Sequence, residues 1–517
     1  MPKQPTDFLL QLIKSMSKPE KRHFKLFVQR NPSNSDSLFL RLFAHLEKQQ
    51  SYDEIKILSQ IPEIKKQQLP NLKAHLYKQL LLSLRLIHRS DNEDIDIRER
   101  IDYARILYNK GLYRQSLEML ARAKEKCQSL GFPSLLMEII DFEKLIESQY
   151  ITRSIANRAE ALSNEAIRTA EEIMRIQKYS NLSLQLYALY LKVGYVRNEK
   201  DHFLVKEFFQ SHKLTDHEDS LGFYEHLYLY QSYVWHSYML LDFKLYYRYS
   251  QKWISLFDSH ENMIMLERPL YLKGMHNLLN ALFLLQRHDK FMVSLQLLLI
   301  NLKKYPARNE NDKSLEFIYT YTHKINQHYL EGTFNQGLPL VQDIMSAIKT
   351  NVFHLDFHRI ILFYYKIACL YFGSGDNSQA IDYLNMIVNE SPDFRGDIQC
   401  YARILRVIAY YEMGDNYLVE YQVKSIYRFL IKMDDLHAVQ KEILSFIRKL
   451  PRVQTSDLKR EFKKLLDRLN RLKSDPYEQR SFLYLDIISW LESKIQGVPV
   501  QTIIKDKFLK KSKRKLA

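Results

Sequence analysis

Two short patterns in the sequence come closest to a catalytic or ligand-binding motif. The segment Gly332–Gly337 has the two-glycine spacing of a phosphate-binding loop, but Leu338 and Pro339 follow where such a loop requires Lys and then Ser or Thr. His354 and His358 are four residues apart and could share one helix face, but no Glu lies beside His354 and no third metal ligand is near in the sequence. We therefore expect a protein that is not an enzyme and that uses no cofactor and no metal ion.

The cysteines and the apolar segments bear on the compartment. Cys127, Cys369 and Cys400 are far apart and follow no CxxC spacing, so we expect neither a disulfide framework nor a zinc site. The first residues are interrupted by Lys14 before a signal-peptide core could form, and the longest apolar stretch, residues 291–302, is too short to span a bilayer. We predict a cytoplasmic protein with no membrane association.

The composition predicts helices. The 517 residues are 46% hydrophobic and 26% charged, which is the balance of an ordered globular protein. They include only 12 Gly and 14 Pro, where average usage would give about 36 and about 26. Because sheet-rich proteins need such residues at their many reverse turns, the shortage favours an all-α fold of long helices with short connections.

Residues 1–92 are predicted to form an N-terminal helical domain. Ser17–Glu20 combines a capping Ser, a Pro in the first helical turn and a Glu three residues after the cap. Two further patterns, at residues 38–46 and 72–87, place leucines on one helix face, and polar residues 90–94 mark a boundary.

Residues 93–450 repeat one kind of turn between helices. In residues 108–116, Gly111 is followed two residues later by Tyr113 and then by the small residue Ser116. Similar turns are centred on Phe243, Phe291, Phe334, Asn377 and Tyr417, which lie 48, 43, 43 and 40 residues apart. The 130 residues from Tyr113 to Phe243 equal three units of about 43 residues.

This turn resembles that of tetratricopeptide repeats, whose first helix ends in Gly and whose second helix carries large and small residues at fixed positions. The period is longer than the usual ~34 residues, and Asn377 stands where the family has an aromatic residue. The resemblance implies an alpha-alpha superhelix, a TPR-like solenoid, in which stacked helix pairs bury faces that no pair could bury alone.

The same resemblance implies a concave surface lined by the first helix of each pair. In that register the partner-binding residues would be Arg105, Asn109, Gln231, Trp235, Tyr238, His276, Arg287, Thr322, Asn326 and Tyr329. Each of them could instead be a contact between helices, above all Trp235 and Tyr238.

Positive charge is concentrated near the end of the chain. Of the net charge of +16, residues 458–517 carry +9. Residues 458–472 predict an amphipathic helix that docks its apolar stripe on the last repeats and exposes its basic face. We expect residues 451–504 to form a C-terminal helical cap and residues 505–517 a basic tail, in which the run of residues 510–515 is frayed. The residues that could contact phosphates are Lys459, Arg460, Lys463, Lys464, Lys510, Lys511, Lys513, Arg514 and Lys515, although a solubilising role is the favoured explanation of this charge.

Two functions remain open from the sequence. The first is a non-enzymatic protein- or peptide-binding scaffold that uses the concave helical surface. The second is a nucleic-acid-associated regulatory protein, since residues 1–30 also carry +5 and residues 51–84 loosely resemble a helix-turn-helix, for which a plain helical cap is the alternative. Nucleic-acid binding would weaken steeply as salt rises.

Overall fold

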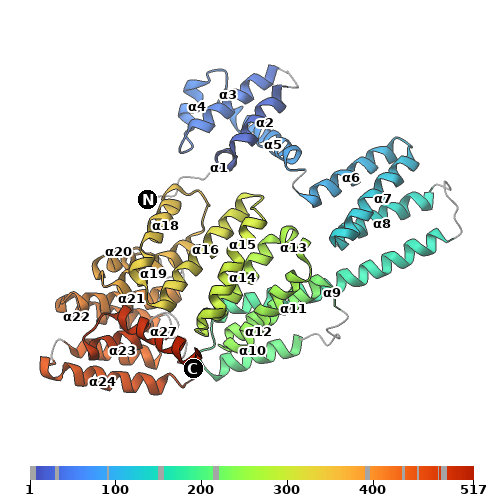
Figure 1. The fold of residues 1–517 in the computed structure, drawn as a ribbon. Coiled ribbons are helices and arrows are strands. Elements are labelled where there is room, and N and C mark those ends of the chain that lie inside the picture. Colours follow the sequence, from blue (N-terminus) through green and yellow to red (C-terminus); the bar gives the residue numbers. More distant parts are fainter. Residues whose placement is uncertain are drawn as a thin grey trace. The chain divides into compact units, whose positions relative to one another are not determined.

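The fold is described from a computed structural model that covers residues 7–29, 34–89, 92–149, 157–212, 221–390, 396–432, 437–450, 453–475, 477–478, 482 and 486–516. In these ranges the chain forms helices and turns and no strand (Figure 1). Most helices pack against their neighbours in sequence, so the predicted all-α solenoid is confirmed. No described helix has both the length and the apolar composition that crossing a bilayer requires. The chain divides into two compact units, Met1–Met174 and Arg175–Ala517.

The first unit begins with a small helical bundle. It contains α1 (Phe8–Ser15), α2 (Lys18–Gln29), α3 (Asn34–Lys48), α4 (Glu54–Gln60) and α5 (Leu69–Ile87). Phe24 of α2 and Phe43 of α3 meet in its core with ring centroids 4.9 Å apart. His23 of α2 and Ser83 of α5 lie 2.8 Å apart and tie these two helices together.

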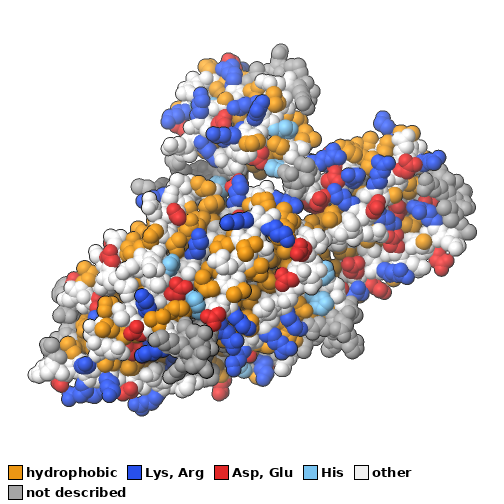
Figure 2. All heavy atoms as spheres, viewed as in Figure 1, with side chains coloured by type: hydrophobic (Ala, Val, Ile, Leu, Met, Phe, Trp, Pro, Cys, Tyr) orange, Lys and Arg blue, Asp and Glu red, His pale blue; other side chains and the backbone are white. Residues whose placement is uncertain are grey.

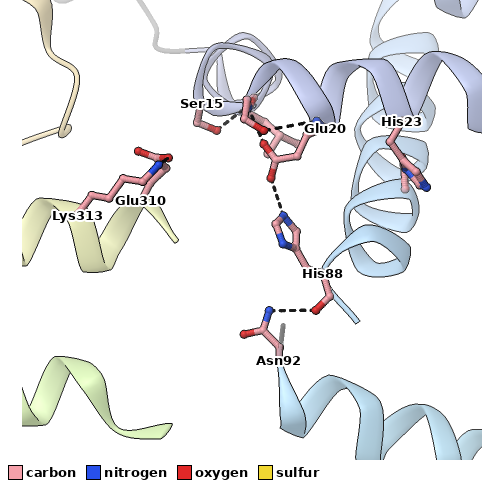
Figure 3. Close-up of polar contacts among 10 residues, drawn as sticks. Ser15, Glu20, His23, His88, Asn92, Glu310 and Lys313 are labelled. Atoms are coloured by element: carbon pink, nitrogen blue, oxygen red, sulfur yellow. Dashed lines mark hydrogen bonds and ion pairs between the residues drawn. The ribbon is translucent and has the colours of Figure 1, made fainter. Parts of the chain in front are cut away.

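The predicted capping box starts α2. The Ser17 amide donates to Glu20 Oε2 over 2.6 Å, and the Glu20 amide donates to Ser17 Oγ over 3.4 Å. Figure 3 shows the carboxylate of Glu20 reaching from α2 to the ring of His88, at 2.5 Å. Asn92 in turn donates to the carbonyl of His88 over 3.3 Å. One glutamate therefore caps α2 and fastens the end of α5.

The connection between α4 and α5 bears on the helix-turn-helix reading. It spans residues 61–68, whereas the turn of a DNA-binding helix-turn-helix has about 3–4 residues. This geometry favours the plain helical bundle.

The rest of the first unit continues as antiparallel helices. They are α6 (Glu93–Asn109), α7 (Tyr113–Leu130), α8 (Pro133–Gln149) and the beginning of α9 (Arg158–Val193). Asp96 near the start of α6 pairs with Arg100 and Lys126, over 2.9 and 3.0 Å. Although burial raises the pKa of Asp96, these two cations lower it to about 2.

The second unit stacks further helices on the end of α9. They are α10 (Glu199–His212), α11 (Phe223–Met239), α12 (Phe243–Asp258), α13 (Glu261–Leu266), α14 (Arg268–Leu284), α15 (His288–Lys304), α16 (Glu310–Glu331), α17 (Phe334–Gly337), α18 (Pro339–Thr350), α19 (Phe357–Ser374), α20 (Asn377–Val388), α21 (Gly396–Glu412), α22 (Asn416–Lys432), α23 (Ala438–Lys449), α24 (Thr455–Leu472), α26 (Ile487–Gln496) and α27 (Val500–Leu516). Helices α14, α16, α19 and α21 each contact the next of these four as well as their sequence neighbours. They are the first helices of successive pairs.

The turn inside the helix pairs has one recurring backbone conformation. The residue two positions before the second helix has a positive φ, which is +75° at Gly111, +67° at Gly332 and +95° at Gly375. Leu241 and Gln286 occupy the same position with φ of +60° and +52°, although a side chain disfavours this conformation. The backbone amide of the residue that follows the positive-φ position donates to the carbonyl oxygen five residues earlier over 2.9 to 3.1 Å, as in a Schellman motif. The residues that donate in this way are Leu112, Asp242, Arg287, Thr333, Asp376 and Asp415.

The predicted turn positions agree closely with these helix starts. Tyr113, Phe243, Phe334 and Asn377 are the first residues of α7, α12, α17 and α20. Phe291 lies within α15, and Tyr417 is the second residue of α22.

Helix α9 explains the long interval between Tyr113 and Phe243. The helices α7, α9, α10 and α12 start at Tyr113, Arg158, Glu199 and Phe243, which are 45, 41 and 44 residues apart. The interval from Tyr113 to Phe243 therefore still corresponds to three repeat units. However, α9 runs unbroken for 36 residues through the position where a turn between two pairs would lie. The two compact units also divide within α9, whereas the predicted boundaries near residues 92, 450 and 504 stay predictions.

The segment predicted as a basic tail begins inside helix α27, which packs against α16, α19 and α26, whereas the fraying expected for residues 510–515 stays a prediction. Ile504 joins the core formed by α16 and α19, and the ring centroid of Phe508 lies 4.6 Å from that of His288. Gly332 lies so close to α27 that a Cβ atom on residue 332 would be 2.5 Å from the backbone nitrogen of Lys505. Few apolar residues suffice for docking because the neighbouring helices provide most of the apolar surface. The side chains of Lys513, Arg514 and Lys515 lie outside the described residues.

Candidate partner-binding face

Several first-helix segments of the second unit contain no acidic residue. Residues 175–193 of α9, all of α14 and all of α19 contain no Asp or Glu, and residues 317–330 of α16 contain none either. The same stretches carry cations, among them Lys273, Lys324, Arg359 and Lys366. This depletion of acids is readable in the sequence and was missed, because it becomes meaningful only once these helices are known to pack side by side.

A lysine and two aromatic rings meet where α9, α11 and α14 pack. The ring centroids of Tyr187 and Trp235 are 4.9 Å apart. The Lys273 Nζ atom lies 5.4 Å from the centroid of Trp235 and 5.9 Å from that of Tyr187. This is the arrangement of a cation–π contact. Lys273 is half-buried, and its burial lowers its pKa.

A neutral histidine pair lies next to this lysine. His276 Nδ1 and His323 Nε2 are 2.9 Å apart, and the His276 ring stacks on Tyr319 with centroids 4.5 Å apart. Burial lowers the pKa of His276 to about 3, and the nearby charges of Lys366, Lys273 and Arg359 act in the same direction. Burial also lowers the pKa of His323 well below its usual range. Three cations therefore surround a pair of rings that stay uncharged near pH 7.

Lys366 of α19 closes the cluster. Its Nζ atom donates to Asn326 Oδ1 over 2.6 Å and lies 5.6 Å from the ring centroid of Tyr329. The Tyr329 hydroxyl donates to the carbonyl oxygen of Lys366. Burial lowers the pKa of Lys366 to about 8. Among the described residues neither Lys366 nor Lys273 has a carboxylate partner, which is unusual for partly buried ammonium groups.

We call this surface the basic–aromatic face. It is formed by Tyr187, Trp235, Lys273, His276, Tyr319 and Lys366, with Asn326 and Tyr329 behind Lys366. The residues come from α9, α11, α14, α16 and α19, so only the packing of sequence-remote helices assembles it. Tyr187 is 38% exposed, and the other five are half-buried, so the face is accessible without being fully solvated.

The predicted partner-binding residues divide between this face and other places. Trp235, His276, Asn326 and Tyr329 contribute to it as described. Tyr238 packs among aromatic residues, 5.0 Å from Tyr246 between centroids. Gln231 and Thr322 are buried, with exposures of 4% each.

The remaining three lie elsewhere. Arg105 and Asn109 are exposed on α6 of the first unit, where the guanidinium carbon of Arg105 lies 3.7 Å from the ring centroid of Phe142. Arg287 is exposed in the turn before α15. Tyr187, Lys273, Tyr319 and Lys366 also belong to the face and were not among the residues predicted from the sequence.

The two motifs weighed for chemistry belong to local structure. Residues 332 and 333 form the turn after α16, and Phe334–Gly337 is the short helix α17. His354 has φ of +46° and precedes α19, which begins at Phe357, so the idea that it shares a helix face with His358 is wrong. In the described part of the chain no three His, Cys, Asp or Glu side chains gather as metal ligands would.

A separate basic surface lies on α24. Phe462, Leu465 and Leu469 are buried against neighbouring helices, which confirms the predicted apolar stripe. The opposite face exposes Lys459, Arg460, Lys463 and Lys464. Figure 2 shows Lys and Arg side chains gathered along this helix. Arg460 and Lys464 pair with Asp457 and Glu461 of the same helix, over 3.1 and 2.6 Å.

Two of the phosphate contacts predicted near the end of the chain, Lys510 and Lys511, are exposed on α27. Lys511 donates to the side chain of Gln286.

Neither a protein-family model, nor a curated protein, nor a solved structure matches this chain. The geometry of the two surfaces is therefore what bears on the function of the protein.

Proposed function

We propose that the protein is a non-enzymatic, cytoplasmic scaffold that binds a protein or peptide partner on the basic–aromatic face. The observation that carries the proposal is the half-exposed cluster of Trp235, Tyr187 and Lys273, assembled from three helices. Partly buried Trp and Tyr side chains of this kind are among the residues that provide most of the binding energy in protein interfaces. Tetratricopeptide-like stacking of helix pairs, which is part of the proposal, presents first-helix residues in the same way.

The location in the cytoplasm rests on the thiols. Cys127 and Cys400 are buried and Cys369 is half-buried, and none of the three forms a disulfide. Cysteines that form no disulfide are typical of a reducing compartment.

Peptide selection tests the proposal. We would select binders to the full-length protein from a random displayed peptide library and measure their affinity for Tyr187→Ala and Trp235→Ala. Each substitution should weaken binding about tenfold or more, because such aromatic anchors contribute more than about 1.4 kcal/mol. Tyr421→Ala, which removes an aromatic side chain that is 67% exposed on α22, should leave binding unchanged. Equal binding to folded Trp235→Ala and to the wild-type protein would contradict the proposal.

The second candidate is a nucleic-acid-associated regulator, favoured by the exposed cations of α24. Lys459 and Lys463 point to solvent without an ion-pair partner among the described residues, so both are available to phosphates. An electrophoretic shift assay over a salt series should then show binding that weakens steeply with salt and is reduced by Lys463→Glu. Absence of a shift at low salt would remove this candidate.

A further inference from the structure

We propose that the basic–aromatic face recognises an acidic segment of its partner, whose Asp or Glu carboxylates pair with the ammonium groups of Lys273 and Lys366. The inference rests on the proposed function, because it names the chemistry of the partner that this face binds. It is independent of the basic surface on α24.

The first argument is unused hydrogen-bonding capacity. An ammonium group has three N–H donors. Lys366 donates to Asn326 alone among the described residues, and Lys273 has no hydrogen-bond acceptor there and faces only the rings of Tyr187 and Trp235. Several N–H donors therefore stay available to a ligand.

The second argument is charge. The three cations that act on His276 are Lys273, Arg359 and Lys366, and only Arg359 has a carboxylate partner, Asp356, at 3.1 Å. The segments of α9, α14, α16 and α19 that carry the face, residues 175–193, 268–284, 317–330 and 357–374, contain no Asp or Glu. An unpaired, partly buried cation costs free energy, and an incoming carboxylate offsets that cost.

The third argument is the environment of the lysines. Aromatic rings and neutral histidines exclude part of the solvent, so a charge-assisted hydrogen bond is stronger here than on an open surface. Trp235 and Tyr187 pack on each other, which suits the apolar side chains that separate acidic residues in a peptide. A nucleic-acid backbone is bound instead by a row of open cations, and here the lysines are half-buried.

A direct binding assay tests the inference on the full-length protein. The probes are a fluorescein-labelled peptide rich in Asp and Glu with one Phe, its Asn/Gln analogue, and single-stranded oligo-dT, each followed by fluorescence anisotropy. The acidic peptide should bind at least about tenfold more tightly than the analogue, and Lys366→Met and Lys273→Met should each weaken it about tenfold or more. The matched control is Lys303→Met, which removes an exposed lysine on α15 and should have no effect.

The pH dependence provides a readout that general misfolding would not produce. Burial lowers the pKa of Lys366 to about 8, whereas the pKa of His276 is about 3 and that of Cys369 about 12. His323 titrates well below this range, and Tyr329 and Tyr365 well above it. Acidic-peptide affinity should therefore be constant between about pH 6 and about pH 7, where the peptide carboxylates are ionised, and fall as pH rises through about 8. Binding near pH 8 should take up protons in the wild-type protein, and Lys366→Met should reduce this uptake to the part that comes from Lys273, whose pKa burial also lowers.

The outcomes separate the inference from the proposed function. If library-selected peptides need Trp235 but the acidic peptide and its Asn/Gln analogue bind equally, the acidic partner is wrong and the scaffold stands. If no peptide depends on Trp235, the proposed function itself fails. Tighter binding of oligo-dT than of the acidic peptide, reduced by Lys366→Met, would overturn the inference in favour of a nucleic acid.

Discussion

Replacing Lys366 by Met should make the protein more stable, although it removes the proposed ligand anchor. The pKa of Lys366 falls from 10.5 to about 8 on folding because the charged form is poorly solvated. Each pKa unit corresponds to about 1.36 kcal/mol, so the charged side chain costs at most about 3 kcal/mol. Since the side chain is only half-buried, we expect about half of this value. Loss of the bond to Asn326 costs about 1 kcal/mol, which leaves a net gain of about 0.5 kcal/mol near neutral pH.

The pH dependence of that difference is the sharper part of the prediction. Because the folded pKa of Lys366 lies below the unfolded value, the unfolded state binds more protons between about pH 8 and about pH 10.5. The free energy of unfolding of the wild-type protein therefore gains about 1–2 kcal/mol from Lys366 as pH rises through this window. Lys366→Met lacks this gain, so the variant should be more stable than the wild type at neutral pH and no more stable near pH ~10.

Tryptophan fluorescence during urea unfolding is the appropriate assay. The chain has three Trp residues, and Trp235, Trp253 and Trp490 all belong to the second unit, so the signal reports the unit that contains Lys366. Lys303→Met serves as the control and should follow the wild type at both pH values. A Lys366→Met variant that differs from the wild type by the same amount at both pH values would refute the buried-charge argument.

Four further substitutions test the packing and the capping of helices. Gly332→Ala should lower the free energy of unfolding by about 2–3 kcal/mol and expose α27 to proteases, because its Cβ would lie 2.5 Å from the Lys505 nitrogen. Gly375→Ala, at φ of +95° with no atom within 4 Å of its Cβ, should lower it by only about 1 kcal/mol in the same urea titration. Gln286→Gly should raise it by about 0.5–1 kcal/mol, since it relieves a left-handed conformation at an exposed residue; a loss would show that its contact with Lys511 dominates. Glu20→Ala should destabilise α2 by about 1 kcal/mol, measured by hydrogen exchange of its amides. Burial raises the pKa of Glu20, but the Ser17 bonds and His88 lower it below 4.5, so this contribution should disappear as pH falls through the folded pKa.

The parts of the fold that depend on local chemistry were readable from the sequence. The capping box of Ser17 and Glu20, the turn before Tyr113 and the apolar stripe of Phe462, Leu465 and Leu469 are set by residues within one or two helical turns of each other. Hydrogen bonding and helical periodicity act over that range, so their sequence signals are direct. Leu241 is an exception, because it adopts the left-handed conformation of these turns although no glycine marks the position in the sequence.

The basic–aromatic face and the docking of α27 were decided by tertiary structure. Trp235 and Lys273 are far apart in sequence, as are Asn326 and Lys366, and nothing in either segment alone shows that they meet. The low pKa of Lys366 has the same origin, since it arises from burial by other helices. The sequence by itself determined which segments become helices and where their pairs turn. The tertiary packing of those helices decided which side chains are desolvated together. Desolvation depends on neighbours that come from distant parts of the chain.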